Sequence, residues 1–208
     1  MARLPRDFYA GDTVKIAQQL LGKFLVRVWQ GEPLVTRITE TEAYVGRCDQ
    51  ACHAYQYRKT PRTSPLFGPP GYSYLYLIYG CYHCLNFVTE PEGEPSGVLI
   101  RAVQPISGLD TIAQLRFQKV LGDLSPYQLK NFMNGPGKLC KGLALDRSCN
   151  QLDLCGDALF VCETCEDLGL PSPTLLQERI CAGPRIGIDY AEEAREFPWR
   201  FWLEQEVS

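Results

Sequence analysis

The sequence has no apolar run long enough to cross a membrane. Its most apolar stretch, Tyr72 to Tyr79, is far shorter than the ~20 residues that a transmembrane helix needs. Residues 1–7, Met-Ala-Arg-Leu-Pro-Arg-Asp, have no apolar core of the kind that defines a secretory signal peptide. We therefore expect a cytoplasmic protein that does not associate with a membrane.

Internal repeats, low-complexity tracts and linker-like segments are also absent. A chain of 208 residues with 45% hydrophobic and 11% aromatic residues can bury a core without disulfides or structural metals. We expect a single domain over residues 1–208, and a monomer without an obligate protein partner.

The ten cysteines lack the spacing of a metal site. Two Cys-x-x-Cys pairs, Cys81/Cys84 and Cys162/Cys165, lie about 80 residues apart, whereas zinc ribbons space such pairs by ~15–20 residues. The first pair falls in a predicted strand, where residues i and i+3 point to opposite faces. We expect free thiols, no metal and no cofactor. A cysteine-based metal or redox protein is the alternative, and elemental analysis would decide it.

Positive charge is scarce overall, since the net charge is −3, but it is unevenly distributed. Residues 101–147 carry about +4 and residues 150–208 about −8. One interpretation is a basic, nucleic-acid-binding side with an acidic back, and the other is simply a solvated acidic C-terminal face. Charge alone does not choose between them. The residues that would form the basic side are Arg58, Lys59, Arg62, Lys138, Lys141 and Arg147.

Hydrophobic periodicity and turn residues predict strands early in the chain, with helices between them. The predicted strands are Phe24–Val28, Leu34–Tyr44, Tyr72–Tyr79, Cys81–Thr89 and Gly97–Val103. The predicted helices are Asp12–Leu21, Ser107–Leu121 with a capping box of Ser107 and Asp110, one from Ser125-Pro126 to Gly135, and a short one after it. Residues 46–71, rich in proline and glycine, predict a long functional loop. We expect an α+β domain with a curved, mainly antiparallel sheet, packed helices and a protruding hairpin.

The strand Leu34–Tyr44 contains a possible general base. A period of two places Glu40, Glu42 and Tyr44 on one face. A carboxylate two residues from a tyrosine, where a strand enters a proline-rich loop, suits that role. The alternative is a surface strand end with solvated glutamates.

The hairpin contains a row of tyrosines. Tyr72, Tyr74 and Tyr76 share one face of the first strand, and Tyr79 lies beside Gly80 at the turn. An aromatic stripe in a strand usually packs in the core. A tyrosine at a hairpin tip would instead be exposed, and tyrosine rings stack on nucleic-acid bases and attract cations.

These residues belong to an ordered set that resembles the alkyladenine type of 3-methyladenine DNA glycosylase, and the set spans nearly the whole chain. Its members are Glu42-Ala43-Tyr44, Asp49, His53, Thr60-Pro61-Arg62, Phe67-Gly68-Pro69-Pro70-Gly71, Tyr74-Leu75-Tyr76, Tyr79-Gly80, Asn86, Arg101, Gly135-Pro136-Gly137-Lys138-Leu139, Arg185-Ile186-Gly187-Ile188 and Pro198-Trp199-Arg200-Phe201.

The resemblance implies a base-excision-repair enzyme that flips alkylated or deaminated purines from double-stranded DNA and hydrolyses the N-glycosidic bond, leaving an abasic site. Implied substrates are 3-methyladenine, 7-methylguanine, hypoxanthine and ethenoadenine. Glu42 matches the family's general base, which deprotonates the attacking water, and Arg101 matches the residue that helps hold that water. The family uses neither a metal nor a lysine Schiff base.

The resemblance also implies how the base is held. Tyr44 and Tyr76 match aromatic residues that sandwich the flipped base, and His53 joins them in the pocket. Tyr79 matches the side chain that wedges into the minor groove and fills the gap. Asn86 matches the residue that disfavours guanine by crowding its exocyclic amine.

The alternative function is a catalytically inactive nucleic-acid-binding module of the same fold. The presence of both Glu42 and Arg101 argues against it, and an abasic-site assay would separate the two. The positions that depart from the family's pattern are Cys52, Leu66, Cys81 and His83.

Overall fold

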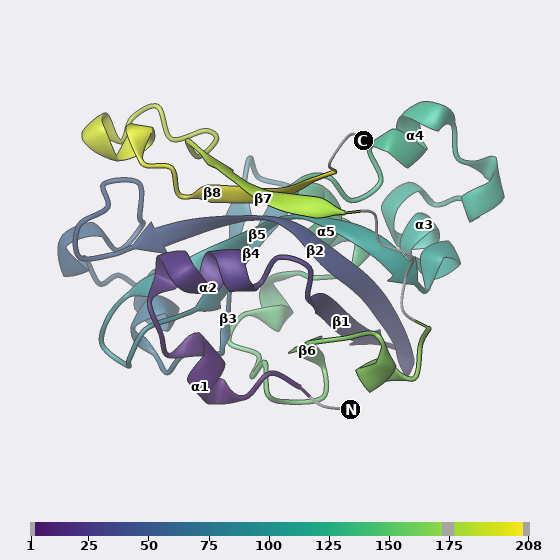
Figure 1. Cartoon of the computed structure of the whole chain (residues 1–208), viewed down its shortest axis with the longest axis horizontal. Helices are drawn as coiled ribbons and strands as arrows, with labels where there is room; N and C mark the ends of the chain where they lie inside the picture. Colours follow the sequence, from purple (N-terminus) through teal and green to yellow (C-terminus); the bar gives the residue numbers. More distant parts are fainter. Residues whose placement is uncertain (1–2, 172–176, 206–208) are drawn as a thin grey trace.

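A curved sheet, to which the described residues contribute eight strands, runs through the middle of the protein (Figure 1). The computed structural model describes residues 3–171 and 177–205. The strands are β1 (Phe24–Trp29), β2 (Glu32–Val45), β3 (Ser73–Ile78), β4 (Tyr82–Val88), β5 (Ser96–Ser107), β6 (Leu159–Cys162), β7 (Glu178–Gly183) and β8 (Arg200–Gln205). Their order is β3-β4-β5-β2-β1-β6, and β8 pairs with both β2 and β7. All these pairings are antiparallel, which confirms the predicted α+β fold and its mainly antiparallel sheet.

Short helices pack around this sheet (Figure 1). They are α1 (Arg6–Tyr9), α2 (Thr13–Gln19), α3 (Leu109–Phe117), α4 (Pro126–Lys130) and α5 (Pro136–Gly142). As predicted, Asp12 caps α2, since its carboxylate accepts a hydrogen bond from the Lys15 backbone N–H at 2.9 Å. Helix α1 was not predicted, because four residues are too few to show a helical period.

The helix predicted from Ser107 begins later, and its capping box is absent. Ser107 still belongs to β5 and pairs with Val35, so Gly108 is the N-cap, without a side-chain capping bond. The Asp110 carboxylate instead accepts from the Leu121 backbone N–H at 3.2 Å. The strand that was predicted to end at Val103 therefore continues to Ser107, as β5.

Two other predicted segments also differ in detail. Helix α4 has a complete capping box between Ser125 and Gln128, but it ends at Lys130 rather than near Gly135. Its C-cap, Asn131, turns its side-chain amide back to the Tyr127 carbonyl at 3.0 Å, and such local bonds compete with helix continuation. The predicted loop 46–71 contains two 3₁₀ turns, Tyr55–Tyr57 and Ser64–Phe67.

The core lies between the sheet and the helices α2, α3 and α5. Ile38 on β2, Phe87 on β4 and Ile100 on β5 are fully buried. They share one hydrophobic cluster with Ile16 and Leu20, which come from α2 and its C-cap. Burial of such side chains contributes ~1.5–3 kcal/mol each. The strands that carry the candidate site residues are therefore held rigidly.

The hairpin of β3 and β4 ends in a tight turn. Tyr79 and Gly80 both have positive φ angles, 50° and 71°, as in the primed turns that suit the twist of a hairpin. The Cys81 backbone N–H donates to the Ile78 carbonyl at 3.2 Å and closes the turn. Tyr79 is 88% exposed, which confirms the predicted exposure of a tyrosine at the tip.

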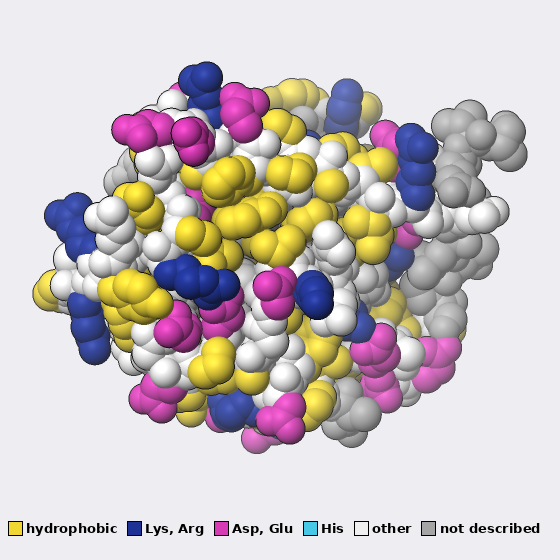
Figure 2. All heavy atoms as spheres, turned by 60° about the vertical axis from the view of Figure 1, so that its left-hand side comes forward, with side chains coloured by type: hydrophobic (Ala, Val, Ile, Leu, Met, Phe, Trp, Pro, Cys, Tyr) yellow, Lys and Arg dark blue, Asp and Glu magenta, His cyan; other side chains and the backbone are white. Residues whose placement is uncertain are grey.

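The molecular surface has apolar as well as charged areas. On the face shown in Figure 2, hydrophobic side chains gather in a band across the centre, and charged side chains of both signs lie around it. Within the described residues, no helix is both long and apolar enough to span a membrane. All ten cysteines are free thiols.

Candidate active site

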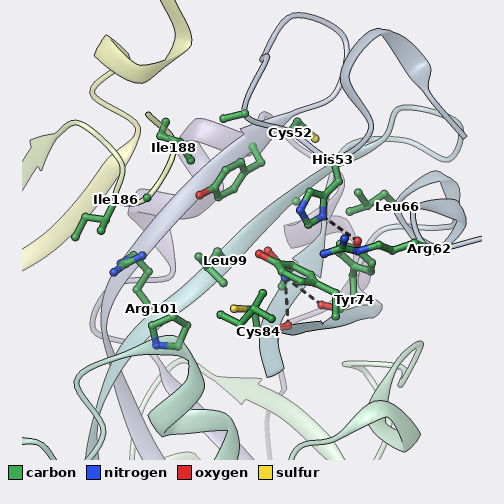
Figure 3. Close-up of a pocket in the computed structure, with 18 of the residues that line it drawn as sticks. Cys52, His53, Arg62, Leu66, Tyr74, Cys84, Leu99, Arg101, Ile186 and Ile188 are labelled. Carbon is green, nitrogen blue, oxygen red and sulfur yellow. Dashed lines mark hydrogen bonds between the residues drawn. The ribbon is translucent and has the colours of Figure 1, made fainter. Parts of the chain in front are cut away.

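A cavity of about 380 Å³ lies where the end of β2, the β3–β4 hairpin, β5 and the segment after β7 meet (Figure 3). Predicted site residues from distant parts of the sequence come together in its wall. They are Tyr44, His53, Tyr76, Tyr79, Asn86 and Arg101. Glu42 is the exception, because its side chain is fully buried and does not line the cavity.

Glu42 lies directly behind the wall, in contact with three residues that form it. The Tyr44 hydroxyl donates to Glu42 Oε2 at 2.6 Å. Arg101 Nη1 lies 3.3 Å from Oε1. The Ile186 backbone N–H donates to the same Oε1 at 2.9 Å. The carboxylate is thus held by two hydrogen-bond donors and one ion-pair partner, from three segments of the chain.

These surroundings act on the pKa of Glu42 in opposite directions. Burial raises the pKa above its ordinary value, because a charged carboxylate loses its hydration. The Arg101 charge and the hydrogen bonds from Tyr44 and Ile186 lower it, and the net pKa is raised. The alternative of a solvated surface glutamate is therefore wrong for Glu42.

Arg101 is itself held in a network of charges. Its Nε donates to Glu40 Oε1 at 3.1 Å, and Arg200 Nε lies 2.8 Å from the same oxygen. Glu40 is only partly buried, with a side-chain exposure of 20%. Two carboxylates on β2 thus orient one guanidinium, with Glu40 at its outer edge and Glu42 at its buried edge.

Aromatic rings form the opposite wall of the cavity. The His53 ring contacts the Tyr76 ring edge-on, with centroids 4.5 Å apart. His53 Nδ1 lies 3.1 Å from the Tyr74 hydroxyl (Figure 3). Burial, together with the charge of Arg62, lowers the pKa of His53 to about 4. His53 is therefore neutral near pH 7.

Asn86 on β4 has a fixed amide in the cavity wall. Its Nδ2 donates to the Tyr74 carbonyl at 3.2 Å and to the Cys84 carbonyl at 3.5 Å. The side chain is buried and lines the cavity. Its orientation is thus set by the backbone of the hairpin.

Two thiols, Cys52 and Cys84, also line the cavity. Burial raises the pKa of Cys52 to about 12 and that of Cys84 to about 11, so both are protonated near neutral pH. In the part of the chain that the structure describes, no group of three or more His, Cys, Asp or Glu side chains is arranged to hold a metal ion.

The sequence did not assign a role to the segment after β7. Ile186, Ile188 and Tyr190 line the cavity, and Ile186 also donates to Glu42. The ordered motif Arg185-Ile186-Gly187-Ile188 was the available signal. Its position against β2 depends on contacts across about 140 residues of sequence, which periodicity does not reveal.

Comparisons with known proteins show the family to which this sequence belongs. The sequence model of the methylpurine-DNA glycosylase family matches residues 7–207. A protein of Desulfitobacterium hafniense (strain Y51) is 45% identical over 204 residues, which are 98% of this chain and 96% of that protein. One of Alkaliphilus oremlandii (strain OhILAs) is 45% identical over 97% of this chain and 95% of its own length. One of Clostridium botulinum (strain Langeland) is 46% identical with the same coverage.

All three relatives are provisionally named as 3-methyladenine DNA glycosylases. The family match covers the chain almost from end to end and includes each of the predicted site residues. The resemblance found in the sequence is confirmed, and this chain belongs to the methylpurine-DNA glycosylase family.

Proposed function

We propose that this protein is a monofunctional DNA glycosylase that flips damaged purines out of duplex DNA and hydrolyses their N-glycosidic bonds. The proposed substrates are 3-methyladenine, 7-methylguanine, hypoxanthine and ethenoadenine, and the product is an abasic site. The observation that carries the proposal is a buried carboxylate, Glu42, held by Arg101 and Tyr44 at the wall of an aromatic cavity.

Glu42 is the general base in this proposal. Cleavage of a glycosidic bond passes through an oxocarbenium-like state, which a nearby carboxylate stabilises while it takes a proton from the attacking water. Each carboxylate oxygen has two lone pairs, and Tyr44 is the one described hydrogen-bond partner of Oε2. That oxygen keeps a lone pair for a second hydrogen bond, which we assign to the attacking water, and we assign to Arg101, in the cavity wall, the role of helping to hold that water.

Tyr44, Tyr76 and His53 stack against the flipped base. Alkylated purines such as 3-methyladenine are cationic, and the faces of tyrosine rings attract cations. A neutral His53 supports this assignment, because a protonated imidazole would repel a cationic base. Asn86 crowds the exocyclic amine of guanine, and its two bonds to backbone carbonyls resist displacement.

Tyr79 fills the gap that the flipped nucleotide leaves. Extrusion of a base costs a few kcal/mol, and a side chain inserted between base steps stabilises the open state. Tyr79 is suited to this role because it is exposed at a hairpin tip and also borders the cavity. The same hairpin carries Tyr76 and Asn86, so insertion and base recognition are mechanically linked.

We also propose that residues 1–208 act as a single domain and a monomer, without a protein partner, on DNA in the cytoplasm. A molecular mass of about 23.5 kDa by light scattering is the expected result, and a stable dimer would contradict it.

The test is single-turnover base release from four duplexes, each with one of the proposed lesions, followed by alkaline cleavage. We expect release of at least one alkylated or deaminated purine and none of normal adenine or guanine. Tight lesion binding with no abasic product would favour the alternative, an inactive binding module of the same fold.

A further inference from the structure

A fully buried ion pair lies on the far side of the cavity wall. Arg185, in the segment after β7, meets Asp49, in the loop after β2. Arg185 Nη1 donates to Asp49 Oδ2 at 2.5 Å, and Nη2 donates to Oδ1 at 2.8 Å. Both side chains have an exposure of 0%. The two parallel bonds fix the plane of the guanidinium as well as its position.

The remaining contacts of Arg185 join it to Ala43 and Tyr44 on β2, to Ala194, and to the Trp199 ring, whose centroid lies 5.3 Å from the guanidinium carbon. Its Nη1 donates to the Ala43 carbonyl at 2.8 Å, and its Nη2 donates to the Ala194 carbonyl at 3.0 Å. The guanidinium carbon lies 4.7 Å from the centroid of the Tyr44 ring. Tyr44 lines the cavity and Arg185 does not, so the guanidinium supports the ring from behind.

The residue after Arg185 contacts the buried carboxylate. The Ile186 backbone N–H donates to Glu42 Oε1 at 2.9 Å. Arg185 therefore fixes the backbone that supplies the Ile186 donor. Arg185 also binds the carbonyl of Ala43, the residue between Glu42 and Tyr44 in the sequence. A shift of Arg185 would move both groups relative to Glu42.

Stability alone is a weak explanation for such a pair. Removing two charges from water costs about as much as their attraction returns, and hydrophobic replacements are often equally stable. A buried bidentate pair does, however, define one geometry. Its contacts with the Ala43 carbonyl and the Tyr44 ring reach the immediate neighbours of Glu42, which points to a role in placing them.

We propose that Arg185, fixed by Asp49, is a positioning residue of the active site that orients the Tyr44 ring and places the Ile186 N–H against Glu42. This inference rests on the proposed role of Glu42 as the base. It predicts that a change at Arg185 lowers the rate of base release more than it weakens DNA binding.

The ionisation of Glu42 gives an independent readout. The groups that act on Glu42 are Arg101 from β5, Tyr44 and Glu40 from β2, Tyr76 from β3, Cys84 from β4, and the Arg185 charge and Ile186 N–H from the segment after β7. The Ile186 N–H lowers the pKa of Glu42. If Arg185 is altered and this donor moves, the pKa of Glu42 rises, and the acid limb of the rate–pH profile moves to higher pH.

The experiment compares Arg185→Lys with Arg37→Lys. Arg37 is a matched control, because it is also buried and makes two bonds to a carboxylate, that of Glu178, at 3.1 Å and 2.6 Å, without lining the cavity. Single-turnover rates are measured from pH 4.5 to pH 8.5, together with affinity for a duplex with an abasic analogue. For Arg185→Lys we expect a rate lower by about 10- to 100-fold, an acid limb at higher pH and affinity within a few-fold. Arg37→Lys should keep the wild-type rate and profile.

A purely structural pair would give a different result. Arg185→Lys would then lower the melting temperature, as we expect of Arg37→Lys, and leave the rate and the acid limb unchanged, which would overturn the inference. If Arg185→Lys does not fold, Asp49→Asn is measured instead, with a smaller change in the same direction expected. A wild-type rate in Glu42→Gln would refute the role of Glu42 itself, so the two failures are distinguishable.

Discussion

Replacing Tyr79 with alanine tests the hairpin tip as a wedge. The side chain is 88% exposed, so its loss opens no core cavity, and a surface change of this kind alters stability by about 0.5 kcal/mol or less. Alanine is preferred to glycine because Tyr79 has a φ of 50°. Glycine would relieve the strain of that conformation and so change the stability of the turn, whereas alanine keeps the same backbone strain as tyrosine.

The expected loss in lesion affinity follows from the ring alone. Stacking of an aromatic side chain on a base is worth ~1–3 kcal/mol, which is a ~5- to ~150-fold increase in Kd. The loss should apply to a duplex with a lesion or an abasic analogue, because only the open duplex has the gap. Affinity for undamaged duplex rests on phosphate contacts and should change far less.

The assay measures three quantities on one preparation: the melting temperature, Kd for an abasic-analogue duplex and Kd for undamaged duplex. Tyr127→Ala is a matched control, because Tyr127 is 76% exposed on α4 and does not line the cavity. It should leave all three quantities unchanged. Unchanged affinity of Tyr79→Ala for the abasic analogue, or an equal loss for both duplexes, would refute the wedge.

Three further predictions concern metals and pH. Base release should survive EDTA and give no borohydride-trapped protein–DNA adduct; loss of activity that zinc restores, or a trapped adduct, would contradict the water mechanism. Burial raises the pKa of Glu42 above the ordinary value of 4.5, and the base must be ionised to act. The rate of hypoxanthine release should therefore fall at acid pH, with a midpoint above pH 4.5. A constant rate down to pH 4 would be evidence against Glu42 as the base. The pKa of His53 is about 4 in the folded protein, against 6.5 for the ordinary side chain. Between these two pH values the unfolded chain binds a proton at His53 that the folded protein does not. The stability that the neutral His53 side chain contributes is therefore present above pH 6.5 and is lost as the pH falls towards 4. His53→Gln should therefore lose less stability than wild type between pH 7.5 and pH 4.5 in urea denaturation; equal losses would show that His53 does not titrate as described.

Local rules predicted much of the framework. Asp12 was identified as a cap because a carboxylate before a helical pattern satisfies free backbone N–H groups. Tyr79 and Gly80 were predicted to form an exposed turn because a glycine between two strand-like runs permits a positive φ. The period of two placed Glu42 and Tyr44 on one face of a strand, and the structure joins them by a hydrogen bond.

Features that depend on distant contacts were not predictable in this way. The sequence left open whether Glu42 is solvated, because the segment that covers it lies about 140 residues away. The pairing of Arg185 with Asp49 is equally remote, and neither residue type indicates its partner. Ser107 looked like a helix cap, but pairing with β2 extended the strand over it. The family resemblance supplied the roles of the site residues, and those roles stay predictions.

The most direct test of the account is single-turnover base release by Glu42→Gln. Glutamine keeps the size of the side chain and an acceptor for the Ile186 N–H, but it cannot take a proton from water. Loss of a general base costs at least ~10²-fold in rate, so we expect a fall of that size or more, with lesion affinity within about tenfold of wild type. Glu163→Gln, at an exposed ion pair with Lys23, is the control and should keep the wild-type rate. A Glu42→Gln protein that releases the base at nearly the wild-type rate would contradict the assignment of Glu42 as the base.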